Sequence, residues 1–482
     1  QDISDYEWMV LSRWLLIISP FYIGHTALTK IVQWNFPEYK HICCLAYSLA
    51  VLFHLMGVRV VLLYLLHCAI MYAVTMLQSK AAVWITSLTL LTTLNFKIPS
   101  LWTSYVLPHD EEDRDFYLLA YTIAFMQLRY TSFCLEKVNN SKLEQIKEKE
   151  EQKRKFDEKG RCDVIQPSVD GSSGRIDHDQ LYMEKPHCDT AFSEERKTQK
   201  DNRKCSKTLC QYSFQDLVFY VFYLPLFFTG PVMTFNIFQK QIDTLLLPWT
   251  KERWKSVGSI FLRSVFWAFI NQLLLHYIYF GAIQQNISVM NDIDMWTLAG
   301  VGYWSGQFFM TKYFVLFCYP ACWARLEGIY PPPGPKCIAY IYTYSDMWKY
   351  IFVPLGGSHT GLHWQVLSSI ACFMFVFYWH GSEYYIFLWT LFNFIGIALE
   401  LIAKKITDLP ELQRIQMDIL GPAWIRRLYA LCTVPLYLLS AITAFCFFGG
   451  SMVGYIFYNR VILQGNYVIL IYYDIGCIID VS

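Results

Sequence analysis

Long apolar runs recur along this chain of 482 residues, and short polar connectors separate them. A helix of about 20 apolar residues crosses the ~30 Å hydrocarbon core of a bilayer, and several runs approach that length. The runs are continuous instead of alternating between apolar and polar positions, so the pattern predicts helices and excludes the strands of a transmembrane barrel. The apolar runs are 14–32, 42–56, 58–77, 81–95, 115–133, 214–236, 257–283, 296–322, 338–354, 363–379, 383–402, 428–448 and 461–479.

This pattern predicts an all-α, polytopic membrane protein with about ten transmembrane helices, and with re-entrant or interfacial segments where a run is too short to span. Composition agrees, because only 16% of the residues are charged and 55% are hydrophobic, whereas about 25% are charged in a soluble domain. The formal net charge of +1 indicates no nucleic-acid partner and leaves membrane lipids as the surroundings. The 15 cysteines show no paired framework, which predicts reduced thiols.

One strongly polar segment divides the chain. Residues 137–210 are rich in charged and small residues, and they cannot bury enough apolar surface to fold alone. We therefore predict N-terminal transmembrane helices in 1–136, a largely disordered loop in 137–210 with a charged helix at 142–161, and a C-terminal transmembrane catalytic core in 211–482. The sequence leaves open which side of the membrane the loop faces. The chain starts at Gln1 without a methionine, which suggests that the natural protein begins upstream.

The most informative polar residue is His380, inside the aromatic and apolar run 373–394. An ionisable side chain at membrane depth is costly unless it faces a cavity or a partner, which favours a functional role. A neutral imidazole accepts a proton near neutral pH, and Gly381 lets the helix loosen directly after it. A helix-packing histidine bonded to backbone is the alternative. The other polar positions within apolar runs fit helix caps or side chains that reach the interface: Asn271, His276, Lys312, Asp346, Asn393, Glu400, Asn459 and Arg460.

Several motifs, taken in order, resemble those of the membrane-bound O-acyltransferases, and within that superfamily those of the Hedgehog acyltransferase branch. The resemblance covers nearly the whole chain except the polar segment, and it is specific only when the motifs are taken together. The motifs are DISDYEW (2–8), TGPVMTFNIFQKQ (229–241), RLEGIYPPPGPKC (325–337), MWKY (347–350), VPLGGSHTGL (353–362), YWHG (378–381) and FFGGSMVGYIFYNRVILQG (447–465).

The resemblance implies a multi-pass enzyme of the endoplasmic reticulum membrane. Such an enzyme moves palmitoyl from palmitoyl-coenzyme A to the N-terminal cysteine amine of Hedgehog-type secreted proteins. His380 then corresponds to the catalytic histidine, Cys337 to the axial thiolate ligand of a haem b iron, and Trp348 to a wall of the acyl-coenzyme A pocket. From the residues alone, Cys337 also fits an ordinary buried thiol and Trp348 an interface anchor.

The chain departs from the family pattern just after Tyr350. The family has a catalytic aspartate and a further stretch before its Pro-x-Gly-Gly-Ser turn, but here Tyr350 runs directly into Ile351 and the turn. Asp346 precedes Trp348 and is not the counterpart of that aspartate. A skipped exon or faulty gene prediction explains the deletion, and so does a true splice form with weakened activity. Two other functions remain open: a lipid-directed acyltransferase of the same superfamily, and an inactive paralogue with a binding or regulatory role.

Overall fold

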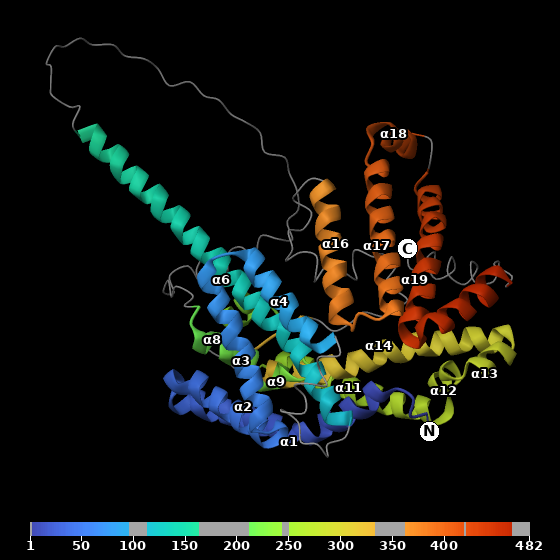
Figure 1. Cartoon of the computed structure of the whole chain (residues 1–482), viewed down its shortest axis with the longest axis horizontal. Helices are drawn as coiled ribbons and strands as arrows, with labels where there is room; N and C mark the ends of the chain where they lie inside the picture. Colours follow the sequence, from blue (N-terminus) through green and yellow to red (C-terminus); the bar gives the residue numbers. More distant parts are fainter. Residues whose placement is uncertain are drawn as a thin grey trace, which may run out of the picture.

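The computed structural model describes residues 2–95, 113–162, 212–242, 250–332, 362–418 and 421–464, and every regular element within these ranges is a helix. Figure 1 shows the chain from the N-terminal helices in blue to the C-terminal helices in red. The helices are α1 (Tyr6–Asn35), α2 (Lys40–Met56), α3 (Val58–Val74), α4 (Lys80–Asn95), α6 (Asp113–Cys162), α8 (Phe214–Val221), α9 (Leu224–Phe227), α10 (Phe235–Ile242), α11 (Lys251–Tyr277), α12 (Phe280–Gln285), α13 (Ile287–Asp292), α14 (Met295–Leu326), α16 (Leu362–Trp379), α17 (Tyr384–Thr407), α18 (Pro410–Asp418) and α19 (Pro422–Phe457), with 3₁₀ turns at Pro37–Tyr39 and Thr75–Leu77 and a π-helix at Tyr458–Leu463.

The prediction of an all-α, multi-pass membrane protein is confirmed. Six helical segments in the described ranges are long and apolar enough to cross a bilayer: 6–35, 37–56, 58–77, 251–277, 384–407 and 442–461. The larger number of about ten stays a prediction, because the runs expected at 338–354 and 461–479 lie wholly or mostly outside the described residues.

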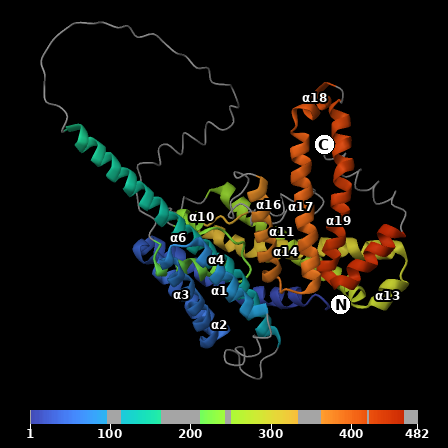
Figure 2. The same cartoon turned by 45° about the horizontal axis from the view of Figure 1, so that its top comes forward.

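Helix α14 connects two groups of helices, which we call the two halves of the molecule: the C-terminal group α16–α19 and the helices that precede it in the sequence. It contacts α1, α9, α11 and α12, and it also contacts α19 in the C-terminal group. In that group α17 packs along α19, while α16 packs on both α17 and α4. Figure 2 shows α17, α18 and α19 as an upright hairpin above α14, with α6 projecting away from the N-terminal helices. The catalytic candidate, at the end of α16, therefore lies where the two halves meet.

The apolar run 214–236 is broken into short helices, so it does not form one span. Residues 217–230 are all buried, although α8 ends at Val221 and α9 starts only at Leu224, next to Pro225. A break inside a membrane protein leaves carbonyl groups without helical partners. Arg129 of α6 donates hydrogen bonds to the carbonyls of Val221 (3.1 Å) and Leu226. This buried cation satisfies the broken helix and fixes it against α6.

Helix α6 starts in the predicted N-terminal group and continues without interruption to Cys162. It includes the charged helix predicted at 142–161. The division of the chain at 136 and 210 stays a prediction, because residues 163–211 lie outside the described ranges. Eight cysteines in the described ranges are free thiols, and all of these except Cys43 are buried, as the missing disulfide framework predicts.

Candidate active site

The end of α16 places His380 at the start of a tight turn. The His380 N–H donates to the Val376 carbonyl (3.0 Å), and the Ser382 N–H reaches back to the Phe377 carbonyl (3.2 Å). Gly381 has φ +117°, a left-handed conformation that ends helices in this way. A Cβ at Gly381 would meet nothing within 4 Å, so the glycine is required for its backbone conformation and not for space. The turn fixes the imidazole at the helix end.

Three aromatic rings surround the half-buried imidazole of His380. The ring centroids of Trp379, Trp389 and Phe447 lie 4.7, 5.4 and 5.1 Å from the imidazole centroid, and each ring is nearly perpendicular to it. Trp389 belongs to α17 and Phe447 to α19, so three helices contribute to this enclosure. Edge-to-face packing of this kind restricts ring orientation and excludes water.

The imidazole nitrogens of His380 make no hydrogen bond to a residue in the described ranges. Close by in sequence, the Ser382 hydroxyl is buried without a hydrogen-bond partner. Within the described ranges no carboxylate forms a hydrogen bond or ion pair with the imidazole. A neutral imidazole held in this way can accept a proton from a reactant that enters the site.

The aromatic contacts around His380 close into a circuit. Trp379 donates from Nε1 to the Ala124 carbonyl (2.9 Å) and packs on Phe125 of α6. The circuit connects α6, α14, α16 and α19 and surrounds the imidazole side of α16 with aromatic side chains. Its members, each in ring contact with the next, are His380, Trp379, Phe125, Phe317, Tyr313, Phe309 and Phe447.

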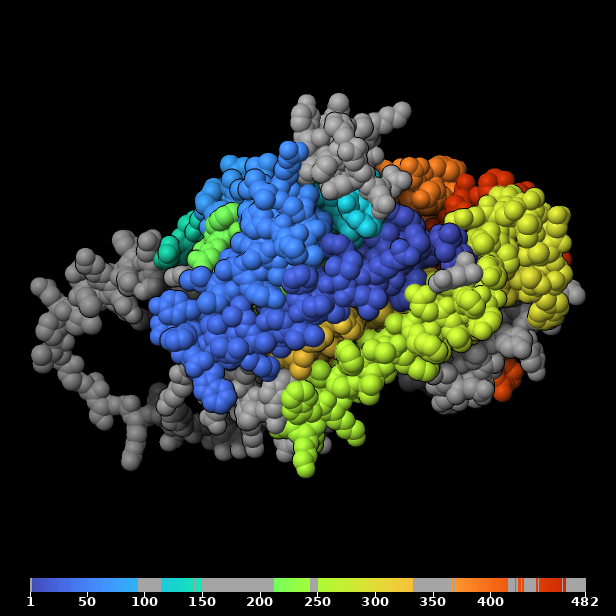
Figure 3. Space-filling model, turned by 90° about the horizontal axis from the view of Figure 1, so that it is seen from below, coloured from blue at the N-terminus to red at the C-terminus, as the bar shows by residue number. Residues whose placement is uncertain are grey.

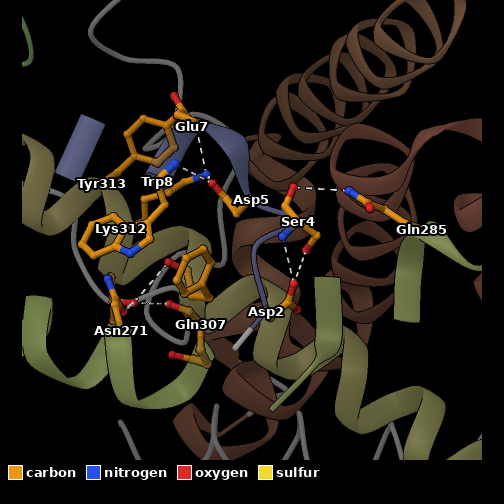
Figure 4. A network of polar contacts seen from close by, with 12 residues as sticks. Asp2, Ser4, Asp5, Glu7, Trp8, Asn271, Gln285, Gln307, Lys312 and Tyr313 are labelled. Atoms are coloured by element: carbon orange, nitrogen blue, oxygen red, sulfur yellow. Dashed lines mark hydrogen bonds and ion pairs between the residues drawn. The ribbon is translucent and has the colours of Figure 1, made fainter. Parts of the chain in front are cut away.

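A charged network borders this circuit at Tyr313. The Lys312 ammonium lies 2.8 Å from a carboxylate oxygen of Asp5 and 2.9 Å from one of Glu7. The Tyr313 hydroxyl donates to the same Glu7 carboxylate (2.9 Å). Figure 4 shows these side chains where the N-terminal segment meets α14. The Lys312 side chain is only 5% exposed, so it is a buried ion-pair partner and does not reach the interface as the sequence suggested.

A second buried network joins α1, the break between α8 and α9, and the end of α14. Glu327 follows α14 and accepts hydrogen bonds from Tyr223 (2.6 Å) and Thr26 (3.0 Å), and it pairs with the His25 ring (2.7 Å). It ties α1 and the broken segment to α14. Asn271 likewise accepts a hydrogen bond from Thr311 (2.6 Å) and joins α11 to α14 instead of capping a helix. Sequence reasoning missed both networks.

Four of the features singled out in the sequence lie outside the described ranges. These are Cys337, Trp348, Asp346 and the junction after Tyr350. Across the described ranges, no group of three or more His, Cys, Asp or Glu side chains is arranged to hold a metal ion. The roles assigned to Cys337 and Trp348 therefore stay predictions.

The sequence of this chain is similar to a known protein family and to several known proteins. The model of the membrane-bound O-acyltransferase family (MBOAT) matches residues 42–443. The chain is 26% identical to protein-cysteine N-palmitoyltransferase HHAT of Mus musculus, over 96% of this chain and 84% of that protein. It is 25% identical to protein-cysteine N-palmitoyltransferase Rasp of Drosophila melanogaster, over 97% of this chain and 81% of that protein. It is also 27% identical to the protein-cysteine N-palmitoyltransferase HHAT-like protein of Mus musculus, over 56% of this chain and 55% of that protein.

Proposed function

This chain belongs to the membrane-bound O-acyltransferase family of enzymes, and we propose that it is a protein palmitoyltransferase. It would transfer palmitoyl from palmitoyl-coenzyme A to the N-terminal cysteine amine of a Hedgehog-type secreted protein in the endoplasmic reticulum membrane. Two relatives named as protein-cysteine N-palmitoyltransferases align over nearly the whole chain and support this substrate class. The observation that carries the proposal is the His380 imidazole, enclosed by three aromatic rings at the junction of the two halves.

His380 would act as the general base. The amine nitrogen of the acceptor attacks the thioester carbonyl, so a C–N bond forms and the C–S bond to coenzyme A breaks. The imidazole takes the proton that the amine loses, and the departing thiolate of coenzyme A receives a proton in turn. General-base assistance contributes about 10²–10⁴-fold to a rate. The correct alignment of acyl donor and amine contributes separately.

The aromatic circuit would hold the acyl chain of the donor. Burial of an alkyl chain is favourable by about 0.8 kcal/mol per methylene, so a palmitoyl chain along apolar walls anchors the donor strongly. The same walls exclude water, which would otherwise hydrolyse the thioester. The site thus combines an apolar lining with a single proton acceptor.

The acceptor class is tested with labelled palmitoyl-coenzyme A and the purified full chain in detergent. We expect hydroxylamine-stable label on a peptide that begins with a free cysteine and none on the same peptide with an acetylated amine, because only the free amine can form an amide, whereas a palmitoyl thioester on the cysteine thiol is cleaved by hydroxylamine. Label on a lysophospholipid acceptor, with the free peptide unlabelled, would contradict the protein substrate and support a lipid acyltransferase.

The missing stretch after Tyr350 requires a control in this assay. The same chain with the family stretch and its aspartate restored is expected to transfer faster, because a carboxylate then supports the His380 imidazole. If neither version transfers to any acceptor, the proposed enzymatic role is wrong. That result would favour a paralogue with a binding role.

We also propose, on the resemblance alone, that Cys337 is the thiolate ligand of a haem b. A thiolate is a competent axial ligand of haem iron. No step of the reaction above involves this group. We expect the purified protein to show a thiolate-type haem absorbance spectrum that disappears in Cys337→Ala and persists in Cys372→Ala, a buried thiol on α16. An unchanged spectrum in Cys337→Ala would remove the assignment.

A further inference from the structure

An apolar hollow of about 210 Å³ lies between α11 and α14. It is smaller than the roughly 300–1,000 Å³ of a typical small-molecule pocket, so it suits a segment of an alkyl chain better than a whole compact ligand. None of its lining residues belongs to the aromatic circuit around His380. The lining includes Trp254, Val257, Gly258 and Phe261 of α11, with Cys322 and Trp323 of α14.

The hollow borders the lipid-facing side of the molecule. Helix α11 is one of the six spanning candidates, and only 17% of its spanning window is buried. Large apolar side chains cover its outer side, including Leu262 (67% exposed) and Phe269 (63% exposed). Figure 3 shows α11 in yellow-green at the surface of the lower face. On a membrane span these exposed side chains contact lipid acyl chains, so a lipid can reach the hollow directly from the bilayer.

Positive charge gathers at one end of the hollow. Arg253 precedes Trp254, and Arg325 precedes Leu326, which also lines the hollow. The guanidinium carbons of Arg253 and Arg325 lie 5.7 and 5.9 Å from the centroid of the same ring, Tyr330. Two cations therefore converge on one aromatic residue beside an apolar hollow.

Arg325 is not neutralised within the described ranges. Its Nε atom is buried without a hydrogen-bond partner, and no described carboxylate forms an ion pair with it. The neighbouring Glu327 carboxylate is already held by Tyr223, Thr26 and His25. Lys30 of α1 interacts electrostatically with both Arg253 and Glu327, so one carboxylate lies among three cations here. The buried Nε atom of Arg325 is therefore a donor at this end of the hollow for which the described residues supply no acceptor.

We propose that an anionic phospholipid binds here, with its phosphate on Arg325 and Arg253 and one acyl chain in the hollow. Guanidinium groups bind phosphate oxygens through paired, charge-assisted hydrogen bonds. Basic pockets between membrane helices are a recognised arrangement for anionic lipid head groups. The bound lipid fills the seam between α11 and α14 and stabilises their packing. This site is separate from the proposed acyl-transfer site.

Two substitutions remove the two halves of this site independently. Gly258→Leu fills the hollow, and a Cβ at Gly258 meets nothing within 4 Å, so the helix tolerates it. Arg325→Gln removes a cation but keeps a polar side chain. The matched control for Gly258→Leu is Gly300→Leu, also with open space around its Cβ and about 33 Å along α14 from Cys322. The matched control for Arg325→Gln is Arg427→Gln, at an exposed position on α19 that does not line the hollow.

Native mass spectrometry of the full chain in detergent, with added phosphatidylglycerol or phosphatidylcholine, measures the bound lipid. We expect wild type and both controls to retain phosphatidylglycerol in preference to phosphatidylcholine. Gly258→Leu should lose the bound lipid, and Arg325→Gln should bind phosphatidylglycerol about tenfold more weakly, the effect of losing one charge-assisted contact. Equal binding of the two lipids by wild type, or equal retention by all variants, would overturn the proposal. Because the readout is lipid binding, it stands apart from any result on acyl transfer.

Discussion

Replacement of His380 by glutamine is expected to lower the rate of acyl transfer by about 10²–10⁴-fold, the usual contribution of a general base. Glutamine keeps a polar side chain of similar length but cannot take a proton from the attacking amine. The enclosing rings Trp389 and Phe447 also contact each other (4.6 Å between centroids), so the helices should stay packed after the change. The measurement is the initial rate of peptide palmitoylation per mole of folded protein, at saturating donor.

The matched control is His67→Gln on α3. His67, like His380, is a histidine in an apolar helix. It is buried, and its ring lies 6.5 Å from that of Tyr130, outside the aromatic circuit. The same chemical change there should leave the transfer rate within a fewfold of wild type. Equal losses at the two positions would show that the His380 effect comes from packing and not from proton transfer.

Replacement of Lys312 by methionine is expected to lower the free energy of unfolding by about 3 kcal/mol, the low end of the range for a broken buried ion pair. Methionine fills the same space but leaves the Asp5 and Glu7 carboxylates without their cation. Both carboxylates are 22% exposed, so water partly offsets the loss, and a value near 5 kcal/mol is not expected. Chemical unfolding of the purified protein in detergent measures the change.

The charge origin of this effect is tested by removing the carboxylates as well. In the Lys312→Met background, Asp5→Asn with Glu7→Gln should recover most of the lost stability, because no buried charge is then left unpaired. No recovery would mean that Lys312 acts through packing alone. Lys251→Met, at an exposed position in the first turn of α11, should change stability by less than about 0.5 kcal/mol.

Most of the helices could be predicted from the apolar runs, because a span in lipid must satisfy its backbone internally and so leaves a long, continuous signal. The run 214–236 was the main exception, and the end of the run 257–283 also breaks, between α11 and α12. Hydrophobicity alone does not distinguish one long helix from short buried helices. Here Pro225 favours a new helix start, and the distant Arg129 stabilises the break by binding its free carbonyl groups. Arg129 lies 97 residues before its partner Leu226, so no local pattern reveals the contact.

The candidate site was predictable only in part. His380 stood out because an ionisable residue in an apolar run is rare, and the flanking motif matched a family. Its ring partner Phe447 comes from another helix and could not be inferred from spacing. The ion pair of Lys312 with Asp5 joins residues 307 positions apart, and a lone lysine in an apolar run more often reaches the interface.

The most direct test of the account compares wild type with His380→Gln in two parallel readings: binding of labelled palmitoyl-coenzyme A, and transfer of the label to the N-terminal amine of a cysteine peptide. The account predicts that both proteins bind the donor with similar affinity, while the variant transfers at least about 100-fold more slowly. A variant that binds the donor and labels the peptide as fast as wild type would contradict it.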